Sequence, residues 1–295
     1  MSIKNNIKDV ALIFEGGGMR ASYTAGLLNI LLENNLYFDY VAGISAGSSH
    51  CVNYISRDIE RARQSFVELV LDPNFGGWKS FLSGKGFFNS KYIYEDAHYN
   101  KALLPLDFDT FMKNPATLKI GAFELGTGIM KYFSKDDIHE VEDLMKIVRS
   151  SSSMPIFMPP TKYREHTYLD GGLGGGIALD IAKRDGFSKF FVLLSQEKGY
   201  RKKSPKFSGI IKSYYKKHPE VIEALMKRHL VYNETLDELE QLESDGKAFL
   251  VYPNTMNVSN REINYQKLVT SYELGYSQGK KDITNWMDFL SQFLE

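Results

Sequence analysis

Short apolar runs alternate with stretches of helical periodicity along the first two thirds of the chain. The runs at 10–14 and 190–194 are continuous, as in strands that are buried on both faces. In 21–34 and 136–149, apolar side chains recur every three or four positions, which predicts amphipathic helices. The whole pattern predicts strands at 10–14, 38–44, 163–169 and 190–194, a hairpin within 118–133, and helices at 21–34, 45–56, 136–149 and 177–184. Strands that alternate with helices predict an α/β fold, with a mostly parallel central sheet and helices on both of its faces.

The pattern changes after about residue 196. Long helical stretches follow, interrupted by one short strand-like run at 248–252. We therefore expect an α/β domain over 1–196 and a mainly helical C-terminal region over 197–295 that packs on this domain.

Composition and charge exclude several classes of protein. Lys plus Arg and Asp plus Glu number 36 each, so the overall charge predicts no nucleic-acid partner. The single cysteine, Cys51, excludes an internal disulfide and a cysteine-based zinc cluster. We expect neither a metal nor an organic cofactor. The first residues are polar and no apolar run approaches the roughly 18 residues of a membrane span, which predicts a cytoplasmic protein.

Three successive glycines, Gly16–Gly18, lie between the first predicted strand and the first predicted helix. Such a loop brings backbone N–H groups close to a negative charge. One hypothesis is a dinucleotide site, since Gly16, Gly18 and Ala21 fit G-x-G-x-x-A and Asp39 follows about 20 residues later. A second is a tight turn that requires positive φ. A third is an oxyanion hole, whose amides stabilise an oxygen that becomes negative during a reaction.

The second predicted strand leads into a motif that favours the oxyanion hole. Gly43, Ser45 and Gly47 form G-x-S-x-G at the junction between a strand and a helix. In a nucleophile elbow the serine occupies a sharp turn, and side chains two residues before or after it would collide with the strand or the helix. A dinucleotide site has no need for a serine exposed in this way.

A serine hydroxyl needs a base before it can act as a nucleophile. No histidine lies in an evident catalytic loop, and His50, five residues after Ser45 on the same predicted helix, should point away from it. The better candidate is Asp170, because Gly171 and Gly172 after it leave room for a ligand. An ordinary Asp-Gly turn is the alternative. The remaining histidines are His98, His139, His166, His218 and His229.

Together these motifs resemble those of the patatin-like phospholipase family. That family carries a glycine-rich oxyanion loop G-G-G-x-[RK]-G, then a G-x-S-x-G elbow, then a D-G-[GA] motif with the second member of a Ser–Asp dyad. The matching residues occur here in the same order, at 16–21, 43–47 and 170–172, and the serine-rich stretch 149–160 also matches. Ala21 stands where the family usually has glycine. The resemblance covers roughly residues 8–195 and implies a three-layer α/β sandwich of patatin type.

The resemblance implies a serine acyl hydrolase that acts on phospholipids or lysophospholipids. Ser45 would attack the ester carbonyl, and Asp170 would accept the serine proton. A carboxylate is a weaker base than imidazole, so we expect burial to raise the pKa of Asp170. Arg20 would position the loop or an anionic head group, or form a structural salt bridge. The implied oxyanion loop comprises Gly16, Gly17, Gly18 and Met19, and the supporting residues are Arg20, Gly43, Gly47, Gly171 and Gly172.

Two further segments bear on the substrate. Aromatic residues in 75–99 predict either a lid or acyl-channel wall, or ordinary core packing. These residues are Phe75, Trp78, Phe81, Phe87, Phe88, Tyr92, Tyr94 and Tyr99. Eight Lys or Arg residues and no acidic residue lie in 198–217, which predicts peripheral contact with an anionic lipid surface or a merely solvated surface. Two functions stay open beside a phospholipase: a short-chain carboxylesterase without membrane role, and a non-catalytic lipid- or nucleotide-binding module.

Overall fold

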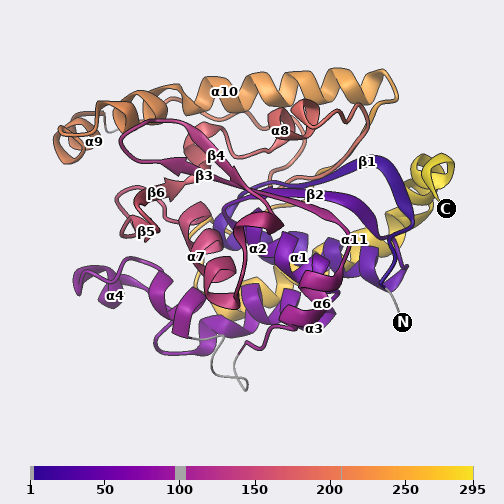
Figure 1. Cartoon of the computed structure of the whole chain (residues 1–295), viewed down its shortest axis with the longest axis horizontal. Helices are drawn as coiled ribbons and strands as arrows, with labels where there is room; N and C mark the ends of the chain where they lie inside the picture. Colours follow the sequence, from indigo (N-terminus) through magenta and orange to yellow (C-terminus); the bar gives the residue numbers. More distant parts are fainter. Residues whose placement is uncertain (1–2, 97–103, 207, 295) are drawn as a thin grey trace.

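One mixed sheet forms the centre of the protein in a computed structural model that describes residues 3–96, 104–206 and 208–294 (Figure 1). Within these residues the strands follow the order β5–β6–β3–β2–β1–β7–β8, and β4 also pairs with β3. The strands are β1 (Ile7–Phe14), β2 (Phe38–Ile44), β3 (Thr117–Glu124), β4 (Met130–Phe133), β5 (Thr161–Tyr163), β6 (His166–Asp170), β7 (Phe190–Leu193) and β8 (Ala248–Val251).

The centre of the sheet is parallel, comprising β3, β2, β1, β7 and β8. Phe14 at the end of β1 lies opposite Gly43 on β2 and Leu193 on β7. The loops that follow these three strands therefore leave the sheet at the same edge. In open α/β sheets, ligands bind outside the carboxyl ends of the strands.

The segment predicted as a single strand at 163–169 is instead a hairpin. β5 and β6 pair antiparallel across a turn in which Arg164 has a φ of 52°, and β6 then pairs antiparallel with β3. β6 and β7 are not neighbours in the sheet, because β3, β2 and β1 lie between them. The predicted hairpin within 118–133 is confirmed by the antiparallel pairing of β3 with β4.

Helices cover both faces of the sheet, which confirms the predicted α/β architecture (Figure 1). Along β1, Val10, Leu12 and Phe14 face the core formed with α1, α2, α7 and α11, whereas Ala11 and Ile13 face the core formed with α8 and α10. This alternation is the period of two that a strand buried on both faces requires. The helices are α1 (Ala21–Glu33), α2 (Ala46–Ile55), α3 (Ile59–Arg63), α4 (Trp78–Leu82), α6 (Phe108–Lys113), α7 (Val141–Ser151), α8 (Leu179–Arg184), α9 (Ser208–Tyr214), α10 (Pro219–Ser244) and α11 (Tyr265–Leu290). The short 3-10 or π turns are η1 (Gly18–Arg20), η2 (Gln64–Glu68), η3 (Leu69–Leu71), η4 (Tyr92–Asp96), η5 (Lys135–Asp137), η6 (Gly171–Gly174) and η7 (Ser291–Phe293).

The helix predicted at 136–149 begins later, at Val141. Ser134 and Asp137 form a capping box around the short turn η5, and Glu140 is extended, with φ −141° and ψ 167°. The capping side chains thus satisfy the backbone locally and end the turn before α7 begins. Apolar periodicity in this segment does not reveal the interruption.

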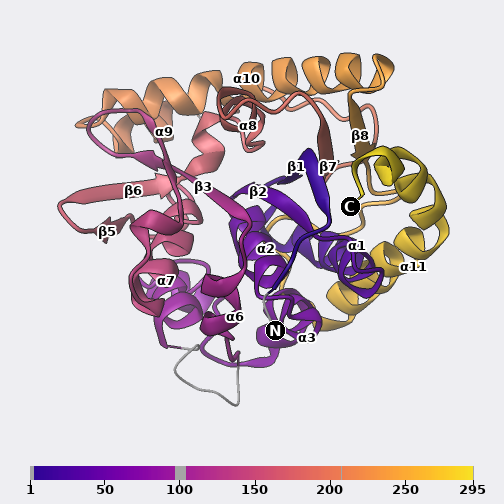
Figure 2. The ribbon, with the colours of Figure 1, turned by 45° about the vertical axis from the view of Figure 1, so that its right-hand side comes forward.

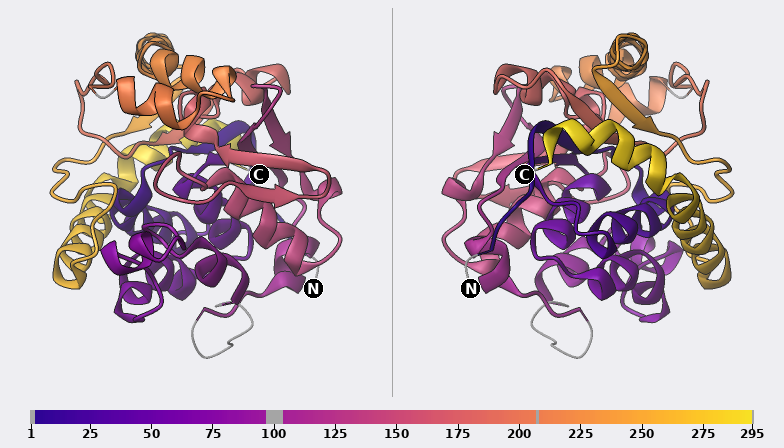
Figure 3. Two further views of the ribbon diagram at one scale, coloured as in Figure 1. Left: turned by 90° about the vertical axis from the view of Figure 1, so that its left-hand side faces the viewer. Right: turned by 90° about the vertical axis from the view of Figure 1, so that its right-hand side faces the viewer.

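The region after residue 196 adds one strand and two long helices to the sheet. β8 pairs with β7 and extends the parallel part, α10 lies over one face, and α11 packs along α1 on the other side (Figures 2 and 3). The contact between α1 and α11 is close at two glycines. A Cβ on Gly26 would lie 2.4 Å from the Tyr276 nitrogen, and one on Gly275 would lie 2.1 Å from the Tyr23 carbonyl oxygen.

None of the helices in the described part of the chain combines the length and the apolar character needed to cross a membrane.

Candidate active site

Ser45 occupies the sharp turn between β2 and α2. Its φ of 56° and ψ of −125° lie in a region that non-glycine residues rarely adopt, as the nucleophile elbow requires. The two motif glycines allow this turn through close backbone contacts. A Cβ on Gly43 would lie 2.4 Å from the Gly47 carbonyl oxygen, and one on Gly47 would lie 2.2 Å from the Phe14 carbonyl oxygen. Side chains at either position would therefore displace β1 or α2.

Asp170 lies at the end of β6, within hydrogen-bond distance of Ser45. The Ser45 Oγ donates to Asp170 Oδ2 at 2.7 Å, and Oδ1 accepts from the Gly172 amide at 2.7 Å. The Asp170 amide donates to the Ser153 carbonyl at 2.8 Å. Ser45 is 8% exposed and Asp170 is 5% exposed, so the pair sits at the base of a cavity rather than on the surface. Gly171 leaves room for the neighbouring strand, since a Cβ there would lie 2.3 Å from the Gly121 carbonyl oxygen.

Burial raises the pKa of Asp170 above its usual value. The hydrogen bonds from Ser45 and Gly172 and the positive charges of Arg228 and Lys202 act in the opposite direction, and burial prevails. A carboxylate with a raised pKa accepts a proton more readily. The environment therefore suits Asp170 to remove the proton from Ser45.

The serine-rich stretch 149–160 holds Ser45 and Asp170 in place through hydrogen bonds to their backbone amides. The Ser45 amide donates to Ser151 Oγ at 2.8 Å, and that hydroxyl donates in turn to the Gly121 carbonyl at 2.6 Å. Ser153 supplies the carbonyl that holds Asp170, and its hydroxyl shares a hydrogen bond with Thr161 at 2.7 Å. The sequence marked this stretch only by its composition, and four consecutive serines do not reveal which of them contacts the elbow.

The glycine loop lines the same cavity as Ser45, and two of its four candidate amides already have hydrogen-bond partners. The Gly16 amide donates to the Gly176 carbonyl at 3.0 Å, and the Met19 amide donates to the Asn260 carbonyl at 3.1 Å. Within the described residues, the amides of Gly17 and Gly18 have no hydrogen-bond partner. The expectation of four donors is therefore corrected to two available ones, since carbonyls already occupy Gly16 and Met19.

His50 lies on α2 but plays no part in this arrangement. Its Nε2 lies 2.8 Å from Thr24 Oγ1 and 3.1 Å from the Ala21 carbonyl oxygen, on the side of the helix away from Ser45. Burial lowers the pKa of His50 to about 3, so the ring is neutral. Cys51 is also buried, and burial raises its thiol pKa well above the usual value. Both side chains serve packing, while His98 lies outside the described residues.

A cavity of about 440 Å³, lined by both polar and apolar residues, opens above the Ser45–Asp170 pair. The glycine loop and the 154–157 segment form one side, and residues of the C-terminal region form the other. Arg20 lines this cavity and its Nε donates to the Ser195 carbonyl at 3.1 Å. Sequence analysis did not single out three residues that also line it, Lys202, Arg228 and Asn260. They come from far along the chain, and only the packing of α10 and of the loop before α11 brings them to the cavity.

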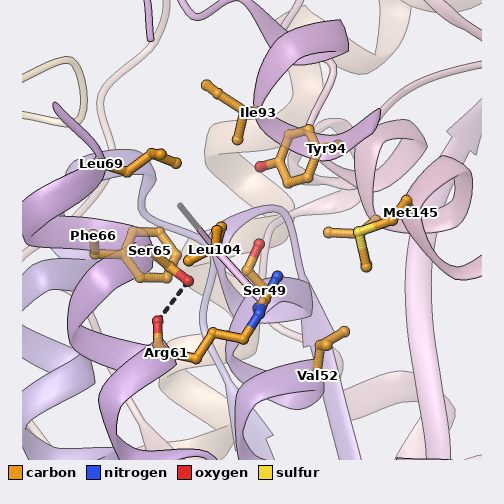
Figure 4. A pocket seen from close by; sticks show the side chains of 11 residues that line it. Ser49, Val52, Arg61, Ser65, Phe66, Leu69, Ile93, Tyr94, Leu104 and Met145 are labelled. Carbon is orange, nitrogen blue, oxygen red and sulfur yellow. Dashed lines mark hydrogen bonds between the residues drawn. The ribbon is translucent and has the colours of Figure 1, made fainter. Parts of the chain in front are cut away.

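Apolar space lies on another side of Ser45. A cavity of about 50 Å³ is bordered by Ser45 itself, Phe75, Phe88 and Tyr94. A further cavity of about 40 Å³ lies next to it, and Phe66, Ile93 and Tyr94 border both (Figure 4). Figure 4 shows the second cavity enclosed by side chains of α2, α3, η2, η3, η4 and α7. The Ser65 hydroxyl at its edge donates to the Arg61 carbonyl at 2.7 Å.

The aromatic segment 75–99 divides between core and surface. Phe75, Phe87 and Phe88 are buried, whereas Trp78 on α4 is 61% exposed. Phe75, Phe88 and Tyr94 border the apolar cavities, and Tyr99 lies outside the described residues. This segment therefore forms a wall beside Ser45.

The residues described contain no group of three His, Cys, Asp or Glu side chains placed to hold a metal ion. The polar groups around the cavity are amides, hydroxyls, one carboxylate and several cations, beside a number of apolar side chains. Such a set is suited to stabilise negative charge on an oxygen.

The chain matches known proteins in two separate stretches. The model of the family "Patatin-like phospholipase" matches residues 12–183, and that of "Domain of unknown function (DUF6363)" matches residues 218–291. A probable lipid hydrolase, 463L, of Invertebrate iridescent virus 6 is 26% identical over 58% of this chain and 62% of its own length. The uncharacterized protein YjjU of Escherichia coli is 24% identical over 62% of this chain and 51% of its own length.

A longer relative covers nearly the whole chain. Lysophospholipase NTE1 of Meyerozyma guilliermondii is 21% identical over 94% of this chain and 19% of its own length. The chain thus spans between a fifth and about three fifths of these relatives. The matched family model covers more than half of the chain and contains the glycine loop, the serine elbow and Asp170. The chain belongs to the patatin-like phospholipase family.

Proposed function

We propose that this protein is a serine lipid acyl hydrolase whose catalytic residues are Ser45 and Asp170. The observation that carries the proposal is the 2.7 Å hydrogen bond from Ser45 Oγ to Asp170, made at a strained elbow that lines the same cavity as two unoccupied amides. A structural serine needs neither the unusual φ nor a buried carboxylate partner. Strain of this kind is maintained where geometry serves function.

The proposed reaction passes through an acyl-enzyme. Ser45 transfers its proton to Asp170 while Oγ attacks the ester carbonyl, and the carbonyl oxygen becomes negative beside the Gly17 and Gly18 amides. When the C–O bond of the ester breaks, Asp170 returns the proton to the departing alkoxide. Water then attacks the acyl-enzyme, Asp170 accepts its proton, and that proton restores the Ser45 hydroxyl as the carboxylic acid is released. The positive end of α2 lies beneath the elbow and favours negative charge there.

The two kinds of space around Ser45 support a lipid substrate. The apolar wall at Phe75 and Phe88 suits an acyl chain, and the larger cavity, which contains the cationic residues, suits the alcohol part of the ester. Relatives whose names describe a lipid hydrolase and a lysophospholipase are consistent with this division. We therefore favour phospholipids or lysophospholipids over short-chain esters.

We also propose a functional division of the chain. The catalytic domain would span 1–196, and the mainly helical region 197–295 would complete the cavity. Support comes from the two separate family matches and from the cavity positions of Lys202, Arg228 and Asn260.

We also propose peripheral membrane contact through 198–217, with fewer cations available than the sequence alone predicts. Arg201 binds Asp237 and Glu240, and Lys198 approaches Glu243. The exposed cations left for a lipid surface are Lys203, Lys206, Lys212, Lys216 and Lys217. Phe207 lies outside the described residues, as does the side chain of Ile210.

Labelling with a fluorophosphonate tests the proposed nucleophile. We expect the wild-type protein to be labelled, Ser45→Ala to be unlabelled, and Asp170→Asn to be labelled far more slowly. Ser56→Ala is the matched control, since Ser56 is a buried serine at the end of α2 that bonds only to helix carbonyls. Folded wild-type protein that resists the probe would contradict a hydrolase and favour a binding protein. Rates on esters of increasing acyl length would then separate a lipid hydrolase from a short-chain carboxylesterase.

A further inference from the structure

Four cationic residues line the same cavity as the Ser45–Asp170 pair; Lys203 is exposed, whereas Arg20, Lys202 and Arg228 are partly buried. Arg20 follows the glycine loop, Lys202 follows β7, and Arg228 belongs to α10. Lys202 and Arg228 lie outside the stretch matched by the patatin-like family model. The family's catalytic motifs therefore do not account for them.

Lys202 and Arg228 are each partly buried, and neither is paired with a carboxylate in the described part of the chain. Among the described residues neither side chain has a carboxylate within ion-pair distance, and the covered Nε of Arg228 has no hydrogen-bond partner. The Lys202 ammonium lies 4.0 Å from the centre of the Tyr232 ring. A Cβ on Gly172 would lie 3.5 Å from Arg228 Nη2, so this guanidinium extends to the neighbourhood of Asp170.

The two carboxylates near the cluster are already engaged by other groups. Glu15 accepts from the Ser195 amide at 2.6 Å and from the Tyr232 hydroxyl at 2.8 Å. Asp170 accepts from Ser45 and Gly172. The cluster therefore presents positive charge to the cavity without a fixed counterion.

Holding these cations close together is electrostatically unfavourable. Burial, and after it the charge of Arg228, lowers the pKa of Lys202 to about 7. Burial also lowers the pKa of Arg228. A cation that is partly buried without a counterion destabilises a fold, so two of them at one cavity are suited to bind an anion.

The neighbouring residue Arg201 differs from Lys202 because carboxylates pair with its charge. Arg201 is adjacent to Lys202 in the chain, yet it donates to Asp237 at 2.8 Å and to Glu240 at 2.7 Å on the outside of α10. Its charge is thus satisfied by the protein. Lys202, by contrast, lines the cavity and has no carboxylate partner among the described residues.

We propose that Lys202 and Arg228, with Arg20, form a subsite for the phosphate group of an acyl ester, so that this enzyme selects phosphate-bearing lipids. Guanidinium and ammonium groups together match the charge and the several oxygens of a phosphate. A phosphate placed there lies beside the alcohol side of the ester, opposite the apolar wall. This assignment of substrate class rests on the proposed hydrolase function.

The decisive measurement is the ratio of kcat/KM for 1-acylglycerol 3-phosphate to kcat/KM for 1-acylglycerol with the same acyl chain. We expect this ratio to fall about tenfold to hundredfold in Lys202→Met and in Arg228→Met, because each loses a charged hydrogen bond. Arg201→Met is the matched control, and its ratio should equal that of the wild type. A ratio that stays constant in both cavity variants would overturn the proposal.

A binding measurement separates this proposal from the hydrolase itself. Ser45→Ala cannot turn over an ester, so its melting temperature can be followed with glycerol 3-phosphate present. We expect stabilisation that disappears when Lys202→Met and Arg228→Met are added. Loss of fluorophosphonate labelling in the wild type would refute the hydrolase while leaving this binding intact. Stabilisation that persists in the triple variant would overturn the subsite. A third outcome is that the triple variant loses the stabilisation by glycerol 3-phosphate while the ratio of the two kcat/KM values stays constant in the single variants. This outcome would overturn the assignment to a lipid and indicate that the subsite binds a free phosphate ester.

Discussion

The catalytic pair and the cations around it come from two regions that are built in different ways. In residues 12–183, the positions of Ser45 and Asp170 are set by backbone contacts, such as those at Gly43 and Gly47, which tolerate no side chain. In the region after 196, Lys202 and Arg228 reach the cavity as long side chains. Geometry that depends on close backbone contacts requires glycines at fixed spacing, which form a recognisable sequence motif. A side chain that reaches the cavity from a distant part of the chain belongs to no such motif. The first region therefore reveals the chemistry, and the second is placed to determine the substrate.

The largest expected effect comes from the first region. Ser45→Ala and Asp170→Asn should each lower kcat by about 10⁴-fold, because either change removes the acyl-enzyme route. The loss should be the same for phosphate-bearing and neutral esters, unlike the loss in the cation variants. Steady-state rates on the two substrates measure this difference. A loss in Asp170→Asn confined to the phosphate ester would contradict its assigned role as base.

A second effect concerns stability across the boundary between the two regions. Gly275→Ala places a methyl group 2.1 Å from the Tyr23 carbonyl oxygen, so α11 must move away from α1. We expect the free energy of unfolding to fall by about 2–3 kcal/mol, as in other overpacked cores. Denaturant unfolding measures the change. Gly209→Ala on α9 is the control, since a Cβ there meets nothing within 4 Å. Equal stability of the two variants would show that the helix contact is dispensable.

In the region after 196, the charge of Lys202 should make kcat/KM depend on pH. Lys202 has a pKa lowered to about 7, so its charge is present below pH 7 and is lost as the pH rises above it. Its charged neighbours are Arg228, Glu15, Arg20 and Asp170. With a phosphodiester lipid, whose charge is constant from pH 6 to 9, kcat/KM should fall by about tenfold above pH 7. The neutral ester should not show this fall.

Replacing the lysine provides the check on that profile. Lys202→Arg keeps a cation that does not titrate in this range, so the fall should move to a higher pH. An unshifted profile would assign the fall to another group.

The smallest expected effect is a gain in stability. Because the pKa of Asp170 is raised in the folded state, the native fold favours its protonated form. Protonated Asp170 therefore stabilises the fold at pH values below its pKa in the unfolded chain. This stabilisation is lost as the pH rises through the pKa of Asp170 in the folded state. At pH 7, Asp170→Asn should increase the free energy of unfolding by about 1 kcal/mol, the usual size of such a trade between function and stability. Thermal melts at pH 7 and pH 4 test this, and the gain should shrink at pH 4.

The parts of the fold that follow from the sequence are those governed by local periodicity. The run 38–44 coincides with β2, and the central parallel strands follow from continuous apolar runs. The hairpin of β5 and β6 could not be predicted, because its turn requires Arg164 to adopt a φ of 52°. An arginine in the sequence does not indicate a positive φ. The late start of α7 likewise depends on a capping box that apolar periodicity does not register.

For the candidate site, motif residues could be predicted but their partners could not. Ser45 and Asp170 lie 2.7 Å apart in the structure, as the motifs suggested. The sequence gives no sign that Asn260 would occupy the amide of Met19, because that contact joins residues more than two hundred positions apart. Clusters of long-range contacts of this kind depend on tertiary packing. The unpaired Lys202 looked like any other residue of a basic stretch until its cavity position was known.

The hydrogen bond from Met19 to Asn260 has a consequence for the order in which the enzyme is made. A nascent chain that has reached residue 200 already contains the elbow, the glycine loop and Asp170, but not the carbonyl that holds Met19, nor β8 beside β7. The glycine loop acquires its observed contacts only after the chain has been synthesised past Asn260. Translation thus separates the appearance of Ser45 and Asp170 from the completion of their surroundings, and a chain still on the ribosome contains the elbow before the contacts around the glycine loop can form.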